Sequence, residues 1–553
     1  MSKKFNRYIL GYAYSILSKY SLKLALIAVL LWLVVLLLSF YYTLVLRDFI
    51  NYLTGLVSET GIISFREKII VFAIILVFVW LAKYIVGVFA EYFLRSTAIN
   101  AIKGLSREFI NKITYAKPRS LPEKGDVLGR FISDLNRVSE LSGLIPSLII
   151  QFARLVIGIV LLYVLNIYLL IASLAALPIY YIVFRISSRK LAEVSEKERK
   201  EFALLSSAIK NVIDYFLHIK LHPVTRSHLG SKTLSKINSW SQKLRRVIFY
   251  DVFFNQTFNN LYVGIRILVL VLGGFLITMG KADIGSVIAF SNAIFNVYEP
   301  VSNMSYMLAA LGELKPYVER VEEILGVEVE NEEEGIELRC VDEIIIKNVD
   351  VVDKGRRILS NVNAIFKKGE VYSVMGPTGS GKSTLLLTIV RYYEPQNGEV
   401  IINGIDYRKY KLRSLRERIV YLPQFPLVFR GSLRENICLN APVSEEALQE
   451  ALTVAKIDFV KDPNDIIDPE KLSDGQKQRI ALARALIFKP DVLLFDEALN
   501  AVDEATEAYI MERLRDKVKN GQLKIVIVVS HRSSTLKYVD HVYTVENGYV
   551  KSV

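Results

Sequence analysis

The sequence predicts a multidomain membrane protein in which an all-α membrane half precedes a soluble α/β half. Residues 1–327 carry long apolar runs, whereas residues 340–553 alternate short apolar runs with helix-forming segments. The hydrophobic content of 52% is high for a soluble protein, and the apolar half accounts for it. The two cysteines, Cys340 and Cys438, are far apart and indicate neither a disulfide framework nor a zinc site.

Six stretches of the first half are long and apolar enough to cross a bilayer, which takes roughly 20 residues per helix. They lie near residues 24–46, 69–90, 143–165, 167–187, 257–279 and 284–310. Six crossings place both termini on one side of the membrane. The N-terminus is basic between Lys3 and Lys23, which favours the cytoplasmic side of the cytoplasmic (plasma) membrane. The net charge of +13 fits this placement, and no basic stripe with interleaved aromatic residues indicates nucleic acid.

Long polar segments separate the second stretch from the third, and the fourth from the fifth. About fifty to seventy helix-forming residues in each would project tens of ångströms beyond the membrane at about 1.5 Å per residue. Residues 118–125 and 222–230 interrupt them and are candidates for two cytoplasmic tips. An acidic run in residues 328–339 is expected to be a solvated linker between the two halves.

Several polar residues lie within or beside the apolar stretches. They are Lys83, Arg154, Arg266, Asn255, Gln256, Asn259 and Asn260. A charge at membrane depth indicates a functional role, whereas the same residue on a helix that extends beyond the bilayer is simply hydrated. Both interpretations remain open, and Arg266 is the main functional candidate because apolar residues flank it on both sides.

A glycine-rich segment in the second half is typical of a phosphate-binding loop, since it lies between a short apolar run and a leucine-rich segment. It comprises Gly376, Pro377, Thr378, Gly379, Ser380, Gly381, Lys382, Ser383 and Thr384. Glycines let backbone N–H groups point at phosphate oxygens at the start of the following helix. Lys382 is expected to reach the β- and γ-phosphates, and the Ser383 hydroxyl is expected to bind Mg²⁺. The sequence therefore predicts binding of a nucleoside triphosphate.

Further candidates follow in chain order at the ends of predicted strands or the starts of helices. Gln424 is a candidate Mg²⁺ ligand, and Ser473, Gly475 and Gln476 are candidates for contact with phosphate oxygens. Asp496 is expected to hold Mg²⁺ and its water shell, while Glu497 orients or deprotonates the attacking water. His531 is a candidate for contact with the γ-phosphate and with Glu497.

These motifs, in this order, resemble those of the ATP-binding cassette (ABC) superfamily. The chain is similar to an exporter-type half-transporter, with six long helices of the type IV exporter fold ahead of an α/β P-loop NTPase domain. The resemblance makes 376–384 the Walker A loop, Gln424 the Q-loop, 472–476 the signature, Asp496 the end of Walker B, Glu497 the catalytic carboxylate, Asp503 the end of the D-loop and His531 the switch histidine. In the membrane half, Gly125, Asp126, Arg130, Asp134, Gly285, Pro300 and Arg320 match the pattern of such exporters.

The resemblance implies a Mg²⁺-dependent ATPase that moves a hydrophobic or amphipathic drug, lipid or peptide outward. Two nucleotide domains would close head to tail on two ATP molecules, and the helices would swing from inward- to outward-facing. An ATP-gated or regulatory subunit on the same scaffold is the alternative.

The sequence departs from the family pattern in three places. Asp353 stands where an aromatic residue usually stacks on adenine, and Arg356 or Arg357 is a candidate substitute. Asp474 replaces the usual glycine of the signature, where its carboxylate is expected to repel the γ-phosphate of the partner's ATP. Residues 462–471 are short and lack the recognisable exporter loop. An altered signature beside an intact Glu497 favours a heterodimer over a homodimer.

Overall fold

The computed structural model describes residues 3–553 apart from 56–61, 123, 354, 531 and 533–534. The chain divides into two compact units. The first comprises Met1–Thr114 and Leu121–Val327, and the second comprises Tyr115–Ser120 and Glu328–Val553. A helical unit followed by a unit built on β-sheets confirms the predicted fold class.

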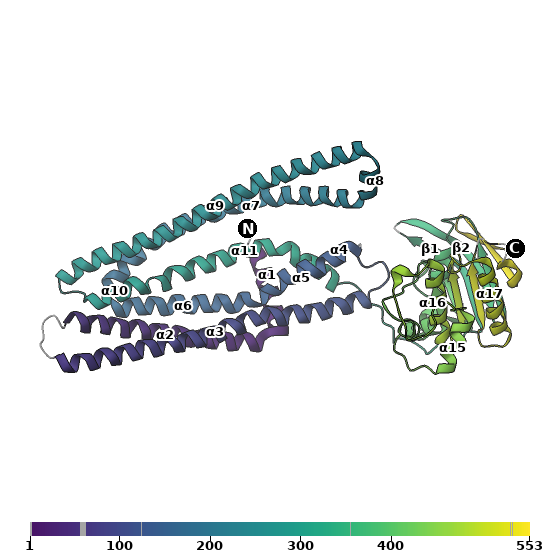
Figure 1. The fold of residues 1–553 in the computed structure, drawn as a ribbon, viewed down its shortest axis with the longest axis horizontal. Coiled ribbons are helices and arrows are strands. Elements are labelled where there is room, and N and C mark those ends of the chain that lie inside the picture. Colours follow the sequence, from purple (N-terminus) through teal and green to yellow (C-terminus); the bar gives the residue numbers. More distant parts are fainter. Residues whose placement is uncertain (1–2, 56–61, 123, 354, 531, 533–534) are drawn as a thin grey trace. The chain divides into compact units, whose positions relative to one another are not determined.

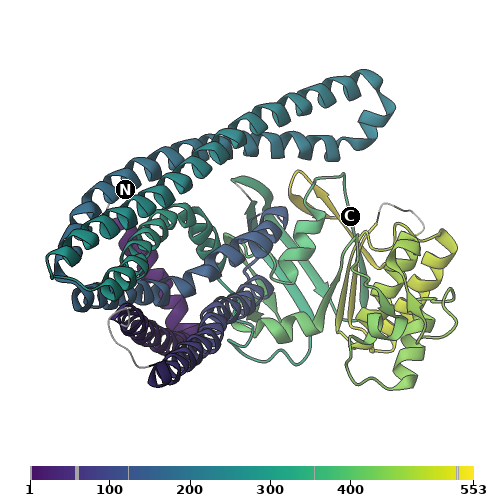
Figure 2. The same cartoon turned by 60° about the vertical axis from the view of Figure 1, so that its left-hand side comes forward.

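The first unit is all-helical in its described residues (Figures 1 and 2). Its α-helices are α1 (Lys3–Ile16), α2 (Leu22–Gly55), α3 (Ile62–Thr114), α4 (Lys124–Gly129), α5 (Leu135–Ser139), α6 (Leu144–Leu165), α7 (Ile167–Asp214), α8 (Phe216–Leu221), α9 (Pro223–Thr278), α10 (Ile284–Ala293) and α11 (Phe295–Leu325). Short π-helical segments at 17–21 and 130–134 and a 3₁₀ turn at 140–143 join some of them.

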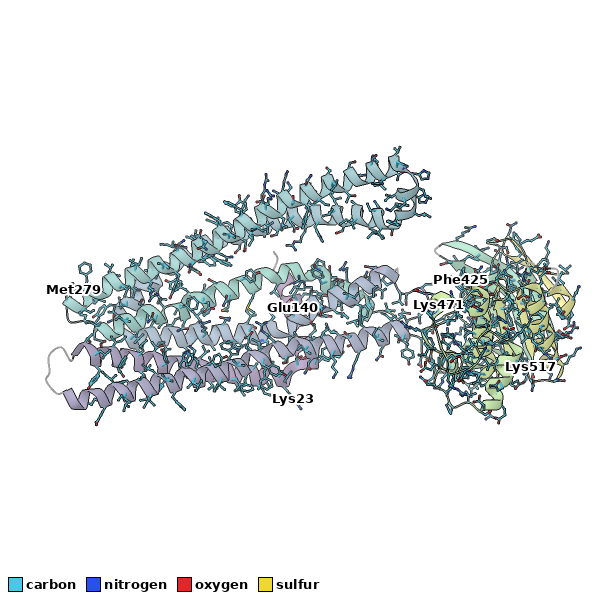
Figure 3. All side chains as sticks on the ribbon, in the orientation of Figure 1. Lys23, Glu140, Met279, Phe425, Lys471 and Lys517 are labelled. Carbon is cyan, nitrogen blue, oxygen red and sulfur yellow. The ribbon has the colours of Figure 1, made fainter. Side chains whose placement is uncertain are left out.

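The longest helix pair of this unit is α7 and α9, which lie side by side with the short α8 joining their ends (Figures 1 and 2). The 56 residues of α9 span about 84 Å, and Met279 follows it at the end opposite α8 (Figure 3). The chain bends at Tyr215 and His222, slightly ahead of the predicted second tip at 222–230.

Five helical segments of the described residues are long and apolar enough to cross a membrane. They are Tyr8–Gly55, Glu67–Thr114, Gly125–Leu165, Ile167–Asp214 and Pro223–Thr278, and they include the first five predicted stretches. The sixth predicted stretch, 284–310, falls on α10 and α11, which are separated at Ile294. Most side chains in the apolar part of these segments face outward, as expected for surfaces that contact lipid.

An ion-pair network joins four of the residues that match the exporter pattern. Arg130 is buried and pairs with Asp126 at 2.7 Å and with Glu323 at 2.6 Å. The fully buried Asp134 pairs with Arg320 at 2.6 Å. Buried charges are stable only when paired, so this network holds the turns after α4 against α11.

In its described residues, the second unit contains three sheets and a set of shorter helices. The strands are β1 (Glu343–Asp353), β2 (Arg356–Lys367), β3 (Glu370–Met375), β4 (Asn397–Ile402), β5 (Ile405–Asp406), β6 (Ile419–Leu422), β7 (Gly431–Ser432), β8 (Ile466–Ile467), β9 (Val492–Asp496), β10 (Ile525–Val529), β11 (His541–Glu546) and β12 (Tyr549–Ser552). The α-helices are α12 (Lys382–Ile389), α13 (Leu412–Arg418), α14 (Leu433–Cys438), α15 (Glu445–Val454), α16 (Asp474–Ile487) and α17 (Glu504–Lys519).

The largest sheet has the strand order β12-β11-β3-β10-β9-β6, and its strands are parallel to one another except β12, which is antiparallel to β11. Successive residues of β9 and β10 alternate between two hydrophobic cores, one on each face of the sheet. The paired registers bring the carboxyl ends of β3, β10, β9 and β6 to one edge. Residues that directly follow these strands therefore gather at that edge.

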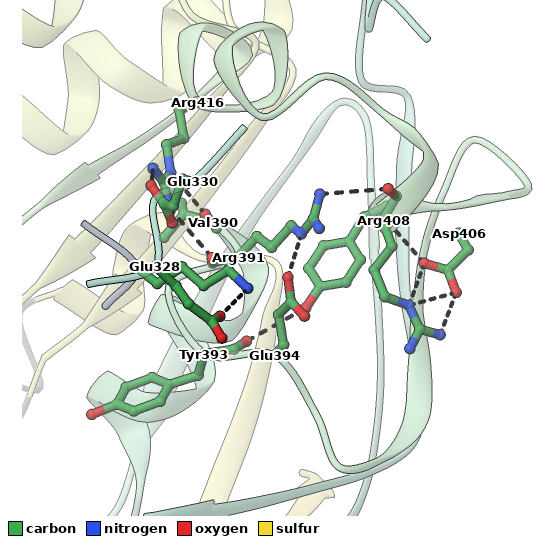
Figure 4. A network of polar contacts seen from close by, with 11 residues as sticks. Glu328, Glu330, Val390, Arg391, Tyr393, Glu394, Asp406, Arg408 and Arg416 are labelled. Carbon is green, nitrogen blue, oxygen red and sulfur yellow. Dashed lines mark hydrogen bonds and ion pairs between the residues drawn. The ribbon is translucent and has the colours of Figure 1, made fainter. Parts of the chain in front are cut away.

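The acidic run was predicted to be a solvated linker; most of its residues are exposed, and some of them pair with basic residues of the second unit, to which the run belongs (Figure 4). Both carboxylate oxygens of Glu330 accept hydrogen bonds from Arg416, at 2.6 and 2.9 Å. The backbone of Ile336 donates to Lys409 and accepts from Lys411. The sequence shows that the run is acidic, but it does not show that the basic residues of 408–416 lie next to it in the folded chain.

Candidate functional site

The phosphate-binding loop lies between β3 and α12, as the strand–loop–helix pattern predicts. Pro377, Thr378 and Gly379 form its exposed part, while Lys382 is 5% exposed. The Lys382 Nζ donates to the carbonyl oxygens of Gly376 and Pro377 at 2.8 and 3.0 Å. The ammonium group is thereby held inside the loop, at the N-terminal end of α12, where the helix dipole favours an anion.

Two details of the loop suit it to phosphate. Gly381 has a φ of +111°, and a Cβ there would lie 2.9 Å from the Leu359 side chain, so the position requires glycine. The Ser380 hydroxyl is buried without a hydrogen-bond partner among the described residues. A buried hydroxyl normally has a partner, and a phosphate oxygen held in the loop would provide one.

A candidate metal site lies where α12 meets β9. The Ser383 hydroxyl donates to Asp496 Oδ1 at 2.8 Å. The second carboxylate oxygen, Oδ2, accepts from the Tyr421 hydroxyl at 2.6 Å. Burial and the Asp496 carboxylate both raise the pKa of Tyr421, so the phenol remains a hydrogen-bond donor. A hydroxyl and a carboxylate are hard oxygen ligands of the kind that Mg²⁺ prefers.

Glu497 follows Asp496 directly and has the left-handed φ of +54°. Its Oε2 accepts hydrogen bonds from Gln424 Nε2 at 3.3 Å and from Asn500 Nδ2 at 3.2 Å. A left-handed conformation is unfavourable for glutamate, and such strain is concentrated at functional sites. The predicted metal and catalytic residues Ser383, Gln424, Asp496 and Glu497 are thus brought together at one edge of the sheet.

The signature residues begin α16. Ser473 and Gln476 form reciprocal side-chain-to-backbone hydrogen bonds of 3.2 and 2.9 Å, which cap the helix. A Cβ on the buried Gly475 would lie 2.5 Å from the carbonyl oxygen of Ala501, so only glycine permits this approach. Asp474 is 70% exposed and pairs with Lys477 at 3.4 Å.

The short stretch before the signature is ordered around β8. This strand pairs with β7, and Asp468 caps the turn at 469–471 through the backbone of Glu470. The stretch thus has a defined structure without the exporter loop that the resemblance led us to look for.

The D-loop candidate Asp503 caps α17, because its side chain accepts from the backbone of Thr506 at 2.9 Å. This hydrogen bond holds the pKa of Asp503 below its usual value. The candidate His531 lies outside the described residues. Its neighbour Arg532 donates to the carbonyl oxygens of Val502 and Asn500 at 2.8 and 2.7 Å, which joins the strand end at 530 to the D-loop.

Sequence reasoning missed Tyr421, Asn500, Gln478 and Arg532. Gln478 donates to the carbonyl oxygen of Gln424 and accepts from the backbone of Ala501, so it links two loops of the site. Tyr421 reads as an ordinary aromatic strand residue, and Gln478 as an ordinary helix residue. The available signal in the sequence was that Tyr421 lies three residues before Gln424 and that Gln478 lies two residues after Gln476.

Comparison with known proteins assigns both units. Residues 24–298 match the family model for the ABC transporter transmembrane region, and residues 359–500 match the model for the ABC transporter. A putative export ATP-binding/permease protein of Rickettsia bellii is 28% identical over 498 residues, covering 85% of this chain and 83% of that protein. A putative export ATP-binding/permease protein of Rickettsia felis is 26% identical over 533 residues, covering 91% of this chain and 88% of that protein.

Two further matches are informative. The alpha-hemolysin translocation ATP-binding protein HlyB of Escherichia coli O157:H7 is 32% identical over 297 residues, which cover 52% of this chain and 42% of that protein. The structure of a bacterial Atm1-family ABC exporter with ATP bound superposes with a TM-score of 0.76 at 18% identity, covering 95% of each chain. At this identity the structural match shows the fold alone.

Proposed function

Because the chain belongs to the ABC transporter superfamily, as an exporter-type half-transporter, we propose that it dimerises and uses ATP hydrolysis to export a hydrophobic or amphipathic substrate by alternating access. The observation that carries the proposal is the arrangement of the nucleotide-binding domain. Different strands and helices bring the candidate residues to one edge of one sheet. These residues are Lys382, the Ser383–Asp496 pair and the Gln424–Glu497 pair.

In this proposal each residue has a separate task. Lys382 neutralises charge on the β- and γ-phosphates, and Glu497 orients or deprotonates the attacking water. Ser383, Gln424 and Asp496 would hold Mg²⁺, which neutralises charge on the phosphate oxygens. The phosphoryl-transfer chemistry is then mostly positioning and electrostatic stabilisation.

We propose that the signature residues Ser473, Gly475 and Gln476, with Asp503, act on the ATP of a partner subunit. The exposed Asp474 carboxylate would face that nucleotide and weaken its binding by like-charge repulsion. A partner with an unaltered signature would complete the site that contains Glu497. For this reason we favour a heterodimer over a homodimer.

Two apolar surfaces of the chain support assembly with a partner. Phe425 and Leu427, which follow the Q-loop, are 79% and 71% exposed (Phe425 is labelled in Figure 3). Phe216 and Leu217, on α8, are 60% and 67% exposed. Exposed apolar side chains at the tip of a helix pair and on a soluble domain indicate surfaces that are buried in an assembly.

A cavity of about 370 Å³ among α7, α9 and α11 supports the proposed class of substrate. Its lining is largely aromatic, and the rings of Tyr180 and Phe258 lie 5.4 Å apart. Asn255 and Asn259, from the amide cluster seen in the sequence, line it together with Asp251. Aromatic rings interspersed with polar side chains fit an amphipathic molecule.

We propose that the chain crosses the cytoplasmic membrane six times, with the nucleotide-binding domain and both termini in the cytoplasm. The apolar segments supply the spans, and the basic N-terminus supplies the orientation.

The function can be tested in sealed vesicles that contain the purified chain, with or without a candidate partner. ATP-dependent accumulation of a fluorescent amphipathic dye against its gradient, abolished by Glu497→Gln, is the expected result. Dye that only equilibrates when ATP is added would instead support a gated or regulatory role.

A further inference from the structure

The segment Tyr115–Ser120 follows the membrane helix α3 in sequence but belongs structurally to the nucleotide-binding unit. Its backbone pairs with the chain that enters this unit: Lys117 N–H donates to the carbonyl oxygen of Glu328 at 2.8 Å, and Glu330 N–H donates to that of Tyr115 at 2.7 Å. The Lys117 ammonium also pairs with the Glu328 carboxylate at 2.7 Å. The segment is therefore a fixed part of the unit that binds nucleotide.

Arg119 within this segment is held in an unusual way. Its φ of +68° is unfavourable for a residue other than glycine. Its guanidinium carbon lies 3.6 Å from the ring centroid of Tyr393, and its Nη1 lies 3.2 Å from the Asp353 carboxylate. The guanidinium lies over one face of the Tyr393 ring. The Arg119 side chain is 31% exposed, so part of its own surface remains open to a ligand.

The contact lies beside the phosphate-binding loop. Asp353 ends β1 and pairs with Arg356 at the start of β2. Two residues further along, the carbonyl oxygen of Ile358 lies 3.2 Å from where a Cβ on Gly381 would be, so β2 runs against the loop. Because Asp353 pairs with Arg356, two residues before Ile358, the end of β1 lies close to the loop that would hold the phosphates of a nucleotide.

Tyr393 and its neighbour Tyr392 pack edge to face, with ring centroids 5.3 Å apart, and Tyr392 is 42% exposed. Tyr393 is covered by the Arg119 guanidinium, and Asp353 stands at the position where the sequence lacks an aromatic residue. Arg356 and Arg357 are exposed, and their positions in the β1–β2 ladder are opposite Asp353 and Val352.

We propose that Arg119 supplies the flat surface on which the base of the bound nucleotide stacks, with Tyr393 behind it and Asp353 fixing its plane. This inference rests on the proposed function, because it assigns the base subsite of the same ATP site. A guanidinium group is planar, delocalised and weakly hydrated, and it stacks well on π-systems. Its charge also compensates Asp353, which would otherwise place an unpaired carboxylate near the triphosphate.

The assignment has a consequence for coupling. Arg119 follows Thr114, the last residue of α3, by five positions. A base stacked on Arg119 would therefore be held by a segment that is covalently continuous with a membrane helix. Nucleotide occupancy and the position of the end of α3 would then be linked through one side chain.

The experiment measures binding of ATP and of inorganic tripolyphosphate, which has no base, to the full-length chain in detergent. Arg119→Ala is expected to weaken ATP binding about tenfold, the loss typical of one stacking contact, and to leave tripolyphosphate binding unchanged. Arg119→Lys, which keeps the charge but not the plane, should resemble Arg119→Ala. Arg413→Ala, which removes an exposed arginine that pairs with Glu333 and Glu417, is the matched control and should bind both ligands as the wild type does. Arg356→Ala tests the other candidate for the stacking residue, and it should show no loss that is specific to ATP.

Three outcomes would overturn the inference. Unchanged ATP binding in Arg119→Ala would show that the base does not use this side chain. An equal loss for ATP and tripolyphosphate would show a structural role, and a base-specific loss in Arg356→Ala would transfer the subsite to that residue. A wild-type chain that binds tripolyphosphate but not ATP would also remove the subsite, whereas one that binds neither would overturn the proposed function itself.

Discussion

Tyr421→Phe removes one hydroxyl beside the candidate metal site and nothing else. The Asp496 carboxylate is 8% exposed and accepts from Tyr421 at 2.6 Å and from Ser383 at 2.8 Å. A hydrogen bond to a charged group contributes about 1.5–3 kcal/mol, and Tyr421 is partly exposed, so we expect the free energy of unfolding to fall by about 1.5 kcal/mol. Loss of a group that orients a metal ligand typically weakens metal binding by about 10–100-fold.

We therefore expect the Mg²⁺ concentration that half-maximally enhances ATP binding to rise about tenfold in Tyr421→Phe. Isothermal calorimetry at a series of Mg²⁺ concentrations measures this value, and thermal unfolding measures stability. Tyr543→Phe is the matched control, because that hydroxyl bonds to the backbone of Ile365, at 3.0 and 2.9 Å, and not to a predicted metal ligand among the described residues. An unchanged Mg²⁺ dependence in Tyr421→Phe would refute the role assigned to its hydroxyl.

Three further predictions concern other parts of the chain. Gly475→Ala places a Cβ 2.5 Å from the carbonyl oxygen of Ala501, so we expect the free energy of unfolding to fall by about 1–3 kcal/mol. An unchanged midpoint of thermal unfolding would contradict the close approach of these two residues. Hydrogen bonds from Arg408 hold the pKa of Asp406 below its usual value, so the stabilisation by the Asp406 carboxylate is complete above about pH 4 and is lost as the pH falls through the lower pKa of the folded state. Asp406→Asn should therefore lose less free energy of unfolding than the wild type between pH 5 and 2. Equal pH profiles for the two proteins would refute this role of Asp406. Phe258→Ala removes an aromatic ring from the wall of the cavity among α7, α9 and α11. Amphipathic dyes should then stimulate ATP hydrolysis less than in the wild type, while the affinity for ATP stays constant. Full stimulation would exclude this cavity as the substrate site.

The sequence was most informative where a motif has a single structural solution. A glycine-rich loop between a strand and a helix, and Asp496-Glu497 at the end of a buried strand, place their side chains through local geometry alone. The register of the parallel strands then brings them to one edge, which follows from topology. The first five apolar stretches were also found within helices of sufficient length.

Contacts between distant segments could not be predicted in this way. The ion pairs of the acidic run were not predicted, because its partners, among them Arg416, lie about eighty residues away in sequence. The Arg119–Asp353 pair joins residues that are separated in sequence by α4 to α11, and no local pattern connects them. Tyr421 was missed because its hydroxyl matters only through its distance to Asp496.

ATP hydrolysis by the chain alone in lipid vesicles tests the central claim most directly, with the wild type compared with Asp474→Gly and with Asp474→Gly combined with Glu497→Gln. We predict slow turnover for the wild type. We expect faster turnover for Asp474→Gly, by about fivefold if removing one like charge about 4 Å from a phosphate in water gains about 1 kcal/mol. The added Glu497→Gln should abolish it. A folded Asp474→Gly chain that does not hydrolyse ATP, or hydrolysis that survives Glu497→Gln, would contradict the account.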